Sequence, residues 1–505
     1  MNNVLNEYYG LLIDKKHLIV IYVVAILLLT IGMFSPKNFQ YPTTEILFFI
    51  FTVFLGIFLI LYSLKHQNEI HKIAFLVIII VGGLSVFFAP PFIIPDEYFH
   101  INHVLDILNG NLFSNSYRVP VNKFYEPLYA NLYHSLKIDP GIRTLLLNNE
   151  VAFKPISNYG EIYLLDRTTE SPFYAYIFSA LGLYIAKALN VGIVCAIWLS
   201  RIPNLLVYAF VTYFVIKKAP LYKMALLVIT CNPLILSLVA SSNYDSFNFM
   251  CLIVAIGFFL LMYENQVKLK YLLGFVVCCI LMGLVKPQFL FTAVLLFIIP
   301  FKNFNFKRIN HKQYRIIISA IVALIIVIMV VGMFLILKGN ISPGVNGHRQ
   351  LIYLASHPNH VFSVFGDGLN FLQNLTVSTP GYRKYFVDSF KGAELYNILY
   401  SAFFIGFSIF YPLKIKLSKN KRIFLGIAIL IFYFGTFFLI YLMWHAVGGA
   451  HVTGAQARYF IPALPLIPLI LNYPFRKIEN IKDYTFLGVI IFSVSLLMFL
   501  VTHFY

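Results

Sequence analysis

Charged residues are scarce in this chain of 505 residues: only 11% are charged, whereas 60% are hydrophobic. Soluble proteins carry about 25% charged residues, so a water-soluble domain, a solenoid and a disordered chain are all excluded. The sequence also lacks a Walker loop, a dinucleotide-binding fingerprint, a His-Glu-x-x-His motif and a nucleophile elbow. The soluble cofactor-dependent enzyme classes therefore have no support.

Cysteine is also scarce, and all five cysteines lie inside apolar runs. This placement is typical of buried free thiols. A disulfide framework or a zinc site would need cysteines in loops or at paired spacings, so neither is expected.

Long apolar runs make up most of the chain. A helix of about 20 apolar residues crosses the ~30 Å hydrocarbon core of a bilayer. The sequence therefore predicts an all-α polytopic membrane protein with about thirteen transmembrane helices. The candidate spans are 17–35, 44–64, 72–92, 192–216, 221–240, 246–263, 270–286, 288–301, 316–337, 396–413, 423–443, 457–473 and 484–503.

A fourteenth apolar run, 172–189, is long enough to cross, and the basic residues decide its placement. Lys and Arg outnumber Asp and Glu by 38 to 20, and cytoplasmic loops collect such an excess. If 172–189 lies in the membrane interface, every basic cluster and the N-terminus are cytoplasmic, and the C-terminus is extracytoplasmic. The net charge of +18 thus indicates topology in a cell membrane and no nucleic-acid partner.

Two segments, 93–171 and 338–395, are too polar for the membrane and too long for turns. Connections longer than about 15 residues usually carry function. The predicted organisation has four parts: an N-terminal two-span addition (1–71), a membrane module (72–337) with a first extracytoplasmic loop and interfacial helices (93–191), a second extracytoplasmic loop (338–395), and a C-terminal helical bundle (396–505).

The sharpest local signal is the string PDEYFH, where a span ends in prolines and the carboxylates Asp96 and Glu97 follow. A helix is predicted to restart here, because proline and acidic residues suit a first helical turn. His100 and His103 would then share a face with Asp96. One interpretation is a base or a metal-binding carboxylate at the membrane surface, and the alternative is a helix cap with a solvated polar turn.

The predicted topology brings three more ionisable residues to the same outer side: Asp245 between two spans, Lys286 at an outer turn, and Arg201 in the outer third of a span. Ionisable residues at membrane depth are costly and are functional candidates by default. Each one alone could be an interfacial side chain that snorkels to water. Together, carboxylates and cations at the outer ends of separate spans favour an anionic lipid head group as ligand.

Two further residues complete the predicted site. Arg458 opens the span 457–473, where its guanidinium could grip a phosphate in bidentate fashion. Glu170, just before 172–189, adds a carboxylate near the same surface. The predicted substrate-binding residues are His100, His103, Glu170, Arg201, Lys286 and Arg458.

The strings PDEYFH, SSNYDS, LVKPQFL and QARYFIPALP resemble a bacterial membrane family called domain of unknown function 2142, over residues 72–473. More broadly, an outer Asp-Glu pair, an interfacial Ser-Pro-Phe-Tyr helix, an Arg-x-Pro span and an outer Asp are similar to the GT-C glycosyltransferase superfamily. That resemblance implies an inverting enzyme that moves a sugar from a polyprenyl-phosphate carrier to a cell-envelope glycan or lipid acceptor outside the cytoplasm.

The resemblance also implies residue roles. Asp96, with Glu97 beside it, would be the catalytic base or a metal-binding group, and Asp245 would complete the catalytic set. A divalent cation such as Mg²⁺ or Mn²⁺ could lie between Asp96 and Asp245, because members of the superfamily differ in their need for metal. The superfamily's Lys/Ser-Pro-Pro motif is replaced here by Glu-Ser-Pro at 170–172, so Lys286, Arg201 or Arg458 would bind the phosphate.

Two other functions stay open. A flippase or transporter of polyprenyl-linked glycans would need polar groups near the membrane midplane, whereas the inner halves of these spans are apolar. A glycan polymerase or ligase is a variant of the transferase, in which a whole glycan moves in place of one sugar.

Overall fold

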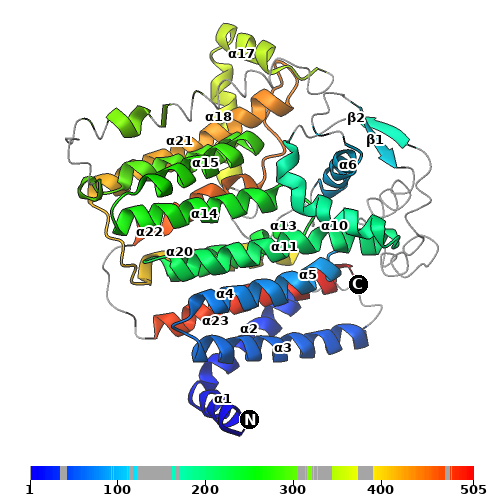
Figure 1. The fold of residues 1–505 in the computed structure, drawn as a ribbon, viewed down its shortest axis with the longest axis vertical. Coiled ribbons are helices and arrows are strands. Elements are labelled where there is room, and N and C mark those ends of the chain that lie inside the picture. The colour runs from blue at the N-terminus through cyan, green and yellow to red at the C-terminus, as the bar shows by residue number, and fades with distance from the viewer. Residues whose placement is uncertain are drawn as a thin grey trace.

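The computed structural model describes residues 2–33, 42–92, 94, 96–110, 112, 118–122, 162–166, 171–304, 313, 316–320, 322–323, 327, 344–373, 391–472, 478 and 480–504. Its long helices lie side by side with nearly parallel axes, and α6, β1 and β2 lie beyond one end of them (Figure 1). The predicted helical class is confirmed. Most of the predicted span 316–337 and most of the first polar segment fall outside the described residues.

The α-helices, in chain order, are α1 (Asn2–Asp14), α2 (Lys16–Met33), α3 (Pro42–Lys65), α4 (Ile70–Val77), α5 (Gly83–Phe88), α6 (Glu97–Leu108), α10 (Ile177–Ala188), α11 (Ile193–Lys218), α12 (Lys223–Thr230), α13 (Pro233–Val239), α14 (Asp245–Glu264), α15 (Leu269–Val285), α17 (Gly347–Ser356), α18 (His360–Gln373), α20 (Lys391–Phe410), α21 (Lys419–Trp444), α22 (Ile467–Leu471) and α23 (Ile481–Phe504). Between them lie a π-helix, η2 (Ile78–Gly82), and the 3₁₀ helices η4 (Phe173–Tyr176), η5 (Pro287–Ile298), η6 (Phe301–Asn303) and η8 (Ala457–Leu466).

One small sheet adds to the predicted all-α class. Strands β1 (Arg118–Asn122) and β2 (Ile162–Asp166) pair antiparallel, with Arg118 opposite Asp166 and Asn122 opposite Ile162. Both strands belong to the first long polar segment, and α6 contacts β1. The described part of this segment is therefore folded against the end of the bundle.

Within the described residues, six helices are long and apolar enough to cross a membrane: Glu45–Lys65, Ile70–Phe88, Ile193–Lys218, Asp245–Glu264, Lys419–Trp444 and Ile481–Val501. Shorter apolar helices accompany them at Lys16–Gly32, Phe173–Ala188, Leu269–Val285, Pro287–Ile298, Leu395–Phe410 and Ala457–Leu471. This pattern supports a multi-pass membrane protein. The count of thirteen spans stays a prediction.

The predicted span 221–240 is two helices, α12 and α13, because an Asn-Pro pair interrupts it. The Asn232 side chain accepts a hydrogen bond from the Ile235 amide at 3.2 Å, and Pro233 takes the first helical position. A side-chain cap followed by proline starts a new helix and cannot continue the old one. Asn232 also donates to the Tyr400 hydroxyl at 2.7 Å, which fixes the break against α20.

Two other predicted spans contain 3₁₀ helices of unusual length. Lys286 ends α15 and caps η5, and Gln456 caps η8, in which Pro462 and Pro465 lie. Runs of 3₁₀ helix longer than about four residues are uncommon, and they often mark functional segments. η5 and η8 pack against each other, so the residues at their N-termini are neighbours.

The run 172–189, which the charge pattern favoured as an interfacial helix, forms η4 and α10. α10 runs antiparallel to α11, since Asn204 donates to the Ser179 hydroxyl at 2.8 Å and Gly182 faces the backbone of Leu199. A Cβ at Gly182 would lie 2.0 Å from the Leu199 carbonyl oxygen, so only glycine permits this approach. α10 therefore packs antiparallel along α11, which is a candidate span, and the interfacial placement of 172–189 stays a prediction.

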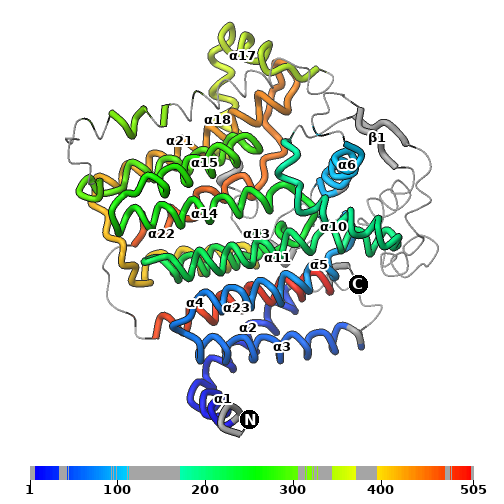
Figure 2. Tube along the Cα trace, in the orientation of Figure 1, coloured from blue at the N-terminus to red at the C-terminus, as the bar shows by residue number. Residues whose placement is uncertain are grey.

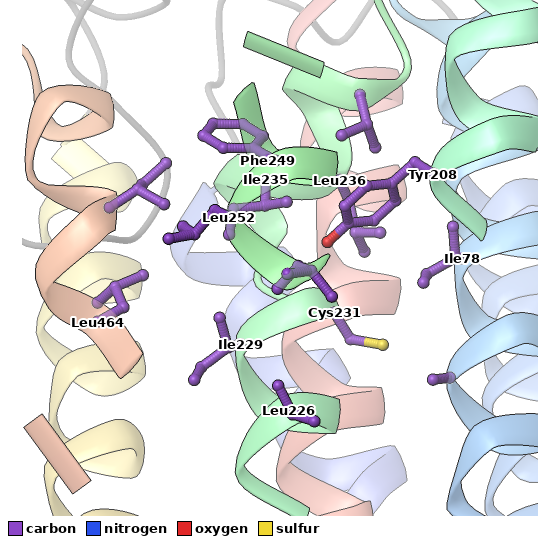
Figure 3. Packing of buried hydrophobic residues seen from close by; sticks show 14 of the residues in the cluster. Ile78, Tyr208, Leu226, Ile229, Cys231, Ile235, Leu236, Phe249, Leu252 and Leu464 are labelled. Carbon is purple, nitrogen blue, oxygen red and sulfur yellow. The ribbon is translucent and has the colours of Figure 1, made fainter. Parts of the chain in front are cut away.

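The core lies where the helices meet along their lengths. Figure 3 shows buried apolar side chains that α12, α13, α14 and η8 direct into the space between the helices, among them Leu226, Ile235 and Leu252, together with Tyr208 of α11. The Tyr208 hydroxyl donates to the Thr230 carbonyl at 3.0 Å, which satisfies the buried phenol. Because lipid tails are as apolar as these side chains, close packing holds such a core together.

The first and last helices form a separate layer of the bundle. α2 and α3, which the sequence assigns to an N-terminal addition, pack against α23. In the candidate span of α23, 89% of the residues are buried. The N-terminal and C-terminal helices thus pack together, and the C-terminal end of α23 lies near α5 (Figure 2).

Candidate active site

The turn after α5 places two adjacent carboxylates in different surroundings. Asp96 has a φ of 66°, in the left-handed region, and caps α6. Phe92, earlier in the turn, has a φ of 64°. Such values are rare for residues other than glycine, and for a bulky residue they need support from neighbouring groups. The left-handed step at Asp96 lets Glu97 point into the bundle while Asp96 lies nearer the surface.

Glu97 forms a buried ion pair with Arg201 of α11, called here the closed pair. Both side chains are 0% exposed. Arg201 donates to the two carboxylate oxygens of Glu97 through Nε at 2.8 Å and Nη2 at 2.6 Å. This bidentate geometry is the strongest form of the Arg–carboxylate interaction.

The remaining hydrogen bonds of the closed pair go to backbone atoms. Arg201 donates to the carbonyls of Val86, Ala89 and Pro90 at 2.6–3.0 Å, so all five of its N–H groups are used. Glu97 accepts from the Phe92 amide and from the Ser242 amide, each at 3.0 Å. The closed pair therefore holds the end of α5, the strained turn and the loop before α14 in fixed positions.

The string SSNYDS forms the loop that starts α14. The Asn243 side-chain oxygen accepts hydrogen bonds from the amides of Asp245, at 2.8 Å, and Ser246, at 3.3 Å. Asn243 thereby satisfies amides of the first turn that have no partner within the helix. Asp245 becomes the first residue of α14 and is fully buried.

Asp245 is one member of a four-residue ionic network, called here the open cluster: Asp96, Asp245, Lys286 and Arg458. Asp245 is paired with Lys286 through Oδ1 and with Arg458 through Oδ2, the latter at 3.2 Å. Arg458 is also paired with Asp96 through its other terminal nitrogen. The guanidinium thus bridges the two carboxylates.

The open cluster lies where helices begin. Asp96 and Lys286 cap α6 and η5, Asp245 starts α14, and Arg458 is the second residue of η8. A helix N-terminus carries a partial positive charge and attracts anions. The formal charges of the two acidic and two basic side chains sum to zero. The partial positive charges of the helix N-termini remain, so the site favours the binding of one additional anion.

Asp96 is the accessible end of the open cluster. Its side chain is 43% exposed, whereas those of Asp245, Lys286 and Arg458 are between 0% and 6% exposed. Partial burial would raise the pKa of Asp96, but the charge of Arg458 and its hydrogen bond hold that pKa below its usual value. In the ligand-free site, Asp96 is therefore ionised and paired.

Two tyrosines enclose the ammonium group of Lys286. Its Nζ lies 4.7 Å from the ring centroid of Tyr244 and 5.1 Å from that of Tyr459. Cation–π contacts of this kind stabilise a cation that has lost water. Neither tyrosine is among the predicted site residues, although each adjoins one of them: Tyr244 precedes Asp245, and Tyr459 follows Arg458.

The two predicted histidines lie behind the open cluster, on the buried face of α6. His100 Nδ1 shares a 2.9 Å hydrogen bond with the Tyr176 hydroxyl, and its ring meets Tyr244 edge-on. His103 Nε2 donates to the Ser171 carbonyl at 3.1 Å. Burial lowers the pKa of His100 to about 3, despite the nearby carboxylates of Asp96 and Asp245, so the ring is neutral at physiological pH.

A cavity of about 290 Å³ opens beside Asp96. Tyr244, Arg458 and Tyr459 line its inner end, and the end of α21 with the turn that follows forms its wall. The lining residues of that wall are Ile440, Trp444, His445, Thr453, Gly454 and Gln456. The accessible carboxylate therefore faces a space large enough for a ligand.

A divalent cation between Asp96 and Asp245, as the sequence resemblance allowed, does not fit this arrangement. The guanidinium of Arg458 already bridges the two carboxylates. In the described part of the chain, no group of three or more His, Cys, Asp or Glu side chains could hold a metal ion.

The structure brings together most residues that the sequence selected. Asp96, Asp245, Lys286 and Arg458 form one network, with His100 and His103 behind it. Glu97 and Arg201 lie next to this network but bond to each other. Glu170 lies outside the described residues. Trp444 was not selected; it stands at the end of α21.

Comparison with known proteins identifies a family. The family model described as "Predicted membrane protein (DUF2142)" matches residues 76–467. No curated protein and no solved structure matches the chain. The matched range includes every described member of the open cluster and of the closed pair.

Proposed function

This chain belongs to the DUF2142 family of predicted membrane proteins, and we propose that it is a glycosyltransferase of the GT-C kind. It would move a sugar from a polyprenyl-phosphate carrier to a cell-envelope glycan or lipid acceptor. The observation that carries the proposal is Asp96, an ionised and accessible carboxylate that is held by Arg458 and lines a cavity.

The cations of the open cluster provide a place for the phosphate of the donor. Arg458 is paired with Asp96 and Asp245, and Lys286 is paired with Asp245. A phosphate can replace a carboxylate on a guanidinium. The replaceable partner is Asp96, because it is exposed whereas Asp245 is buried and bonded to both cations. Donor binding would therefore release Asp96 from Arg458.

Release of Asp96 prepares it to act as a general base. Without the guanidinium beside it, the pKa of its carboxyl rises toward its usual value and the carboxylate becomes a better proton acceptor. The acceptor oxygen then attacks the anomeric carbon as its proton passes to Asp96. The bond from the anomeric carbon to the phosphate oxygen breaks, and the polyprenyl phosphate leaves with the electron pair. A single displacement of this kind inverts the anomeric centre.

The other predicted residues take supporting roles in this mechanism. Arg458 and Lys286 would stabilise the negative charge on the departing phosphate. Glu97 and Arg201 are positioning residues, because their polar atoms are already bonded and they fix the turn that presents Asp96. Neutral His100 forms the back of the site through Tyr244.

The basic residues support an extracytoplasmic site. α11 ends at Lys217 and Lys218, and α21 begins at Lys419, whereas the opposite ends of these helices lie toward the open cluster. Lysine-rich ends are typically cytoplasmic. The open cluster would then face outward, as the proposed transfer requires.

The decisive experiment is a transfer assay in membranes that contain the full-length chain and radiolabelled polyprenyl-phosphate sugars. We expect label to pass from the lipid to an acceptor, and Asp96→Asn to lower the rate by about 10²–10⁴-fold, the usual contribution of a general base. Glu264→Gln, at the far end of α14, is the matched control and should keep the wild-type rate.

Other outcomes of the assay point to the alternatives. Label that crosses the bilayer but stays on the lipid would replace the transferase with a flippase. Transfer of a whole glycan, visible in the size of the product, would assign a polymerase or ligase. Neither transfer nor crossing, with any donor tested, would contradict the proposal.

A further inference from the structure

The cavity beside Asp96 has a wall that the donor phosphate does not use. We propose that this wall binds one neutral sugar ring of the acceptor, stacked on the indole of Trp444. The inference rests on the proposed function and deepens it, because it assigns the acceptor to glycans. It also gives a role to the segment 344–373.

The position of Trp444 is the first observation. Its side chain lines the cavity and is 52% exposed at the C-terminal end of α21. An indole offers a broad, electron-rich face. The C–H groups on one face of a pyranose ring carry partial positive charge, so a sugar is the neutral polar molecule that such a surface suits best.

The second observation is a polar group without a partner. Gln456 is 7% exposed and lines the cavity, and its Oε1 has no hydrogen-bond partner in the described part of the chain. A buried acceptor left unpaired costs free energy, so it is suited to accept a ligand hydroxyl. Thr453 adds a hydroxyl to the same wall.

The charges of the lining restrict the ligand further. Asp96 and Arg458 are the charged residues among those that line the cavity, and they are paired with each other. His445 Nε2 accepts a 2.9 Å hydrogen bond from the Thr453 amide, and its Nδ1 donates to the Ile440 carbonyl at 3.3 Å. The outer wall therefore offers aromatic and neutral polar groups, which match a neutral glycan better than an anionic one.

The wall is fixed before any ligand arrives. Asp367 of α18 accepts a 2.7 Å hydrogen bond from the Val452 amide, and Gln350 of α17 accepts a 2.9 Å bond from the Gly448 amide. These bonds hold the turn 445–453 against α17 and α18. A rigid wall lowers the cost of ordering on binding. The segment 344–373 thus acts as a support for the acceptor wall.

The chain has two tryptophans, which allows a direct binding test. Trp198 lies on α11, half-buried, with its ring edge-on to Phe87. In the full-length Trp198→Phe variant, Trp444 is the single indole fluorophore. The probes are methyl glycosides of glucose, galactose and N-acetylglucosamine, with glycerol and ribitol as polyols that carry hydroxyls but no ring face.

We expect a saturable change in Trp444 fluorescence with at least one methyl glycoside and none with the polyols. An equal response to the polyols would overturn the stacked ring, and no response to any glycoside would overturn the sugar site. Brominated lipids test a third outcome. Strong quenching of Trp444 by them would show that the indole is a membrane anchor, and would also overturn the inference.

Kinetics separate this inference from the proposed function. We expect Trp444→Ala to raise the KM for the acceptor by about two- to tenfold, the usual contribution of an aromatic stacking contact. Trp444→Phe keeps an aromatic ring, so its KM for the acceptor should lie close to that of the wild type. The KM for the donor should not change in either variant. If wild type transfers sugar and Trp444→Ala is unaffected, the inference fails alone. If wild type transfers nothing, the proposed function fails, and the fluorescence titration still decides the sugar site.

Discussion

Asp96 and Glu97 are adjacent in sequence, yet they take part in ionic networks of opposite character. In the closed pair, Glu97 and Arg201 are 0% exposed and bond to each other and to the surrounding backbone. In the open cluster, Asp96 keeps 43% of its side chain exposed and shares one guanidinium with Asp245. One network has no capacity left for a ligand, and the other ends at a cavity.

The difference shows how structural and functional ion pairs can be told apart: by whether all hydrogen-bond donors and acceptors of the paired side chains are already used. A buried pair is stable only when its remaining donors and acceptors are also bonded, and the closed pair meets this condition. A site that binds and releases an anion must instead hold partners that can be exchanged. Variants that remove one partner from each network should therefore have different consequences.

The largest expected effect on folding belongs to Glu97→Gln. The neutral amide leaves the Arg201 guanidinium buried without a counter-charge and weakens the support of the turn at Phe92. Breaking a buried ion pair in this way costs about 3–5 kcal/mol. We expect a loss of folded protein in detergent micelles and a lower thermal midpoint, measured by the change in intrinsic fluorescence on heating.

Asp96→Asn is the matched variant of the neighbouring carboxylate. Arg458 keeps Asp245 as its partner, and exposed pairs contribute at most about 1 kcal/mol, so the thermal midpoint should change little. Equal destabilisation by both variants would show that the open cluster is as structural as the closed pair.

Much of this arrangement could be predicted from the sequence. Apolar runs and few charges indicate a membrane bundle, and four short strings with ionisable residues at span ends indicate a common site. Asp96, Asp245, Lys286 and Arg458 do meet. The physical reason is that ionisable groups at membrane depth need partners, and the ends of neighbouring spans are the nearest places to find them.

The division between the two networks could not be predicted, because it depends on backbone conformation. The left-handed backbone conformation of Asp96 directs the side chains of Asp96 and Glu97 to different sides, and an Asp-Glu pair in a sequence does not indicate this conformation. The 3₁₀ conformation of η5 and η8 was also missed, since a 3₁₀ run has the same apolar composition as an α-helical span. The support of the cavity wall by Gln350 and Asp367 depends on contacts over more than 80 residues of chain.

Arg458→Lys tests the bridge within the open cluster. An ammonium group cannot bond to Asp96 and Asp245 through two separate nitrogens as the guanidinium does. Loss of one charge-assisted hydrogen bond to the phosphate should raise the KM for the donor by about 10- to 100-fold. Arg422→Lys, at the far end of α21, is the control and should leave that KM unchanged. An unchanged donor KM in Arg458→Lys would remove Arg458 from the phosphate site.

The pH dependence of stability tests the buried, neutral state of His100. Burial lowers its pKa in the folded state to about 3, below the 6.5 of the unfolded chain. Between these two pH values the unfolded state binds a proton that the folded state does not. The contribution of His100 to the free energy of unfolding is therefore complete above pH 6.5 and is lost progressively as the pH falls toward 3. From 1.36 kcal/mol for each pKa unit, the loss at pH 5 is about 2 kcal/mol.

The measurement is the thermal midpoint in micelles at pH 7 and pH 5. His100→Asn cannot take up a proton and should lessen the difference between the two midpoints. His357→Asn, at an exposed position, should keep the wild-type difference. If His100→Asn leaves the difference unchanged, another group causes the acid sensitivity.

The smallest expected effect separates two tyrosines of the short helix η4. The Tyr176 hydroxyl bonds to His100 Nδ1 at 2.9 Å, and the Tyr174 hydroxyl donates to the Leu281 carbonyl of α15 at 3.0 Å. Each Tyr→Phe variant removes one hydrogen bond, so each should cost about 1 kcal/mol of stability. Only Tyr176→Phe also removes the hydrogen bond that holds the His100 ring behind Tyr244, so only this variant should lower the transfer rate. Equal rates in the two variants would mean that His100 supports the fold and not the open cluster. His100 would then count as a structural residue, whereas Tyr244, which contacts Lys286, would remain part of the functional site.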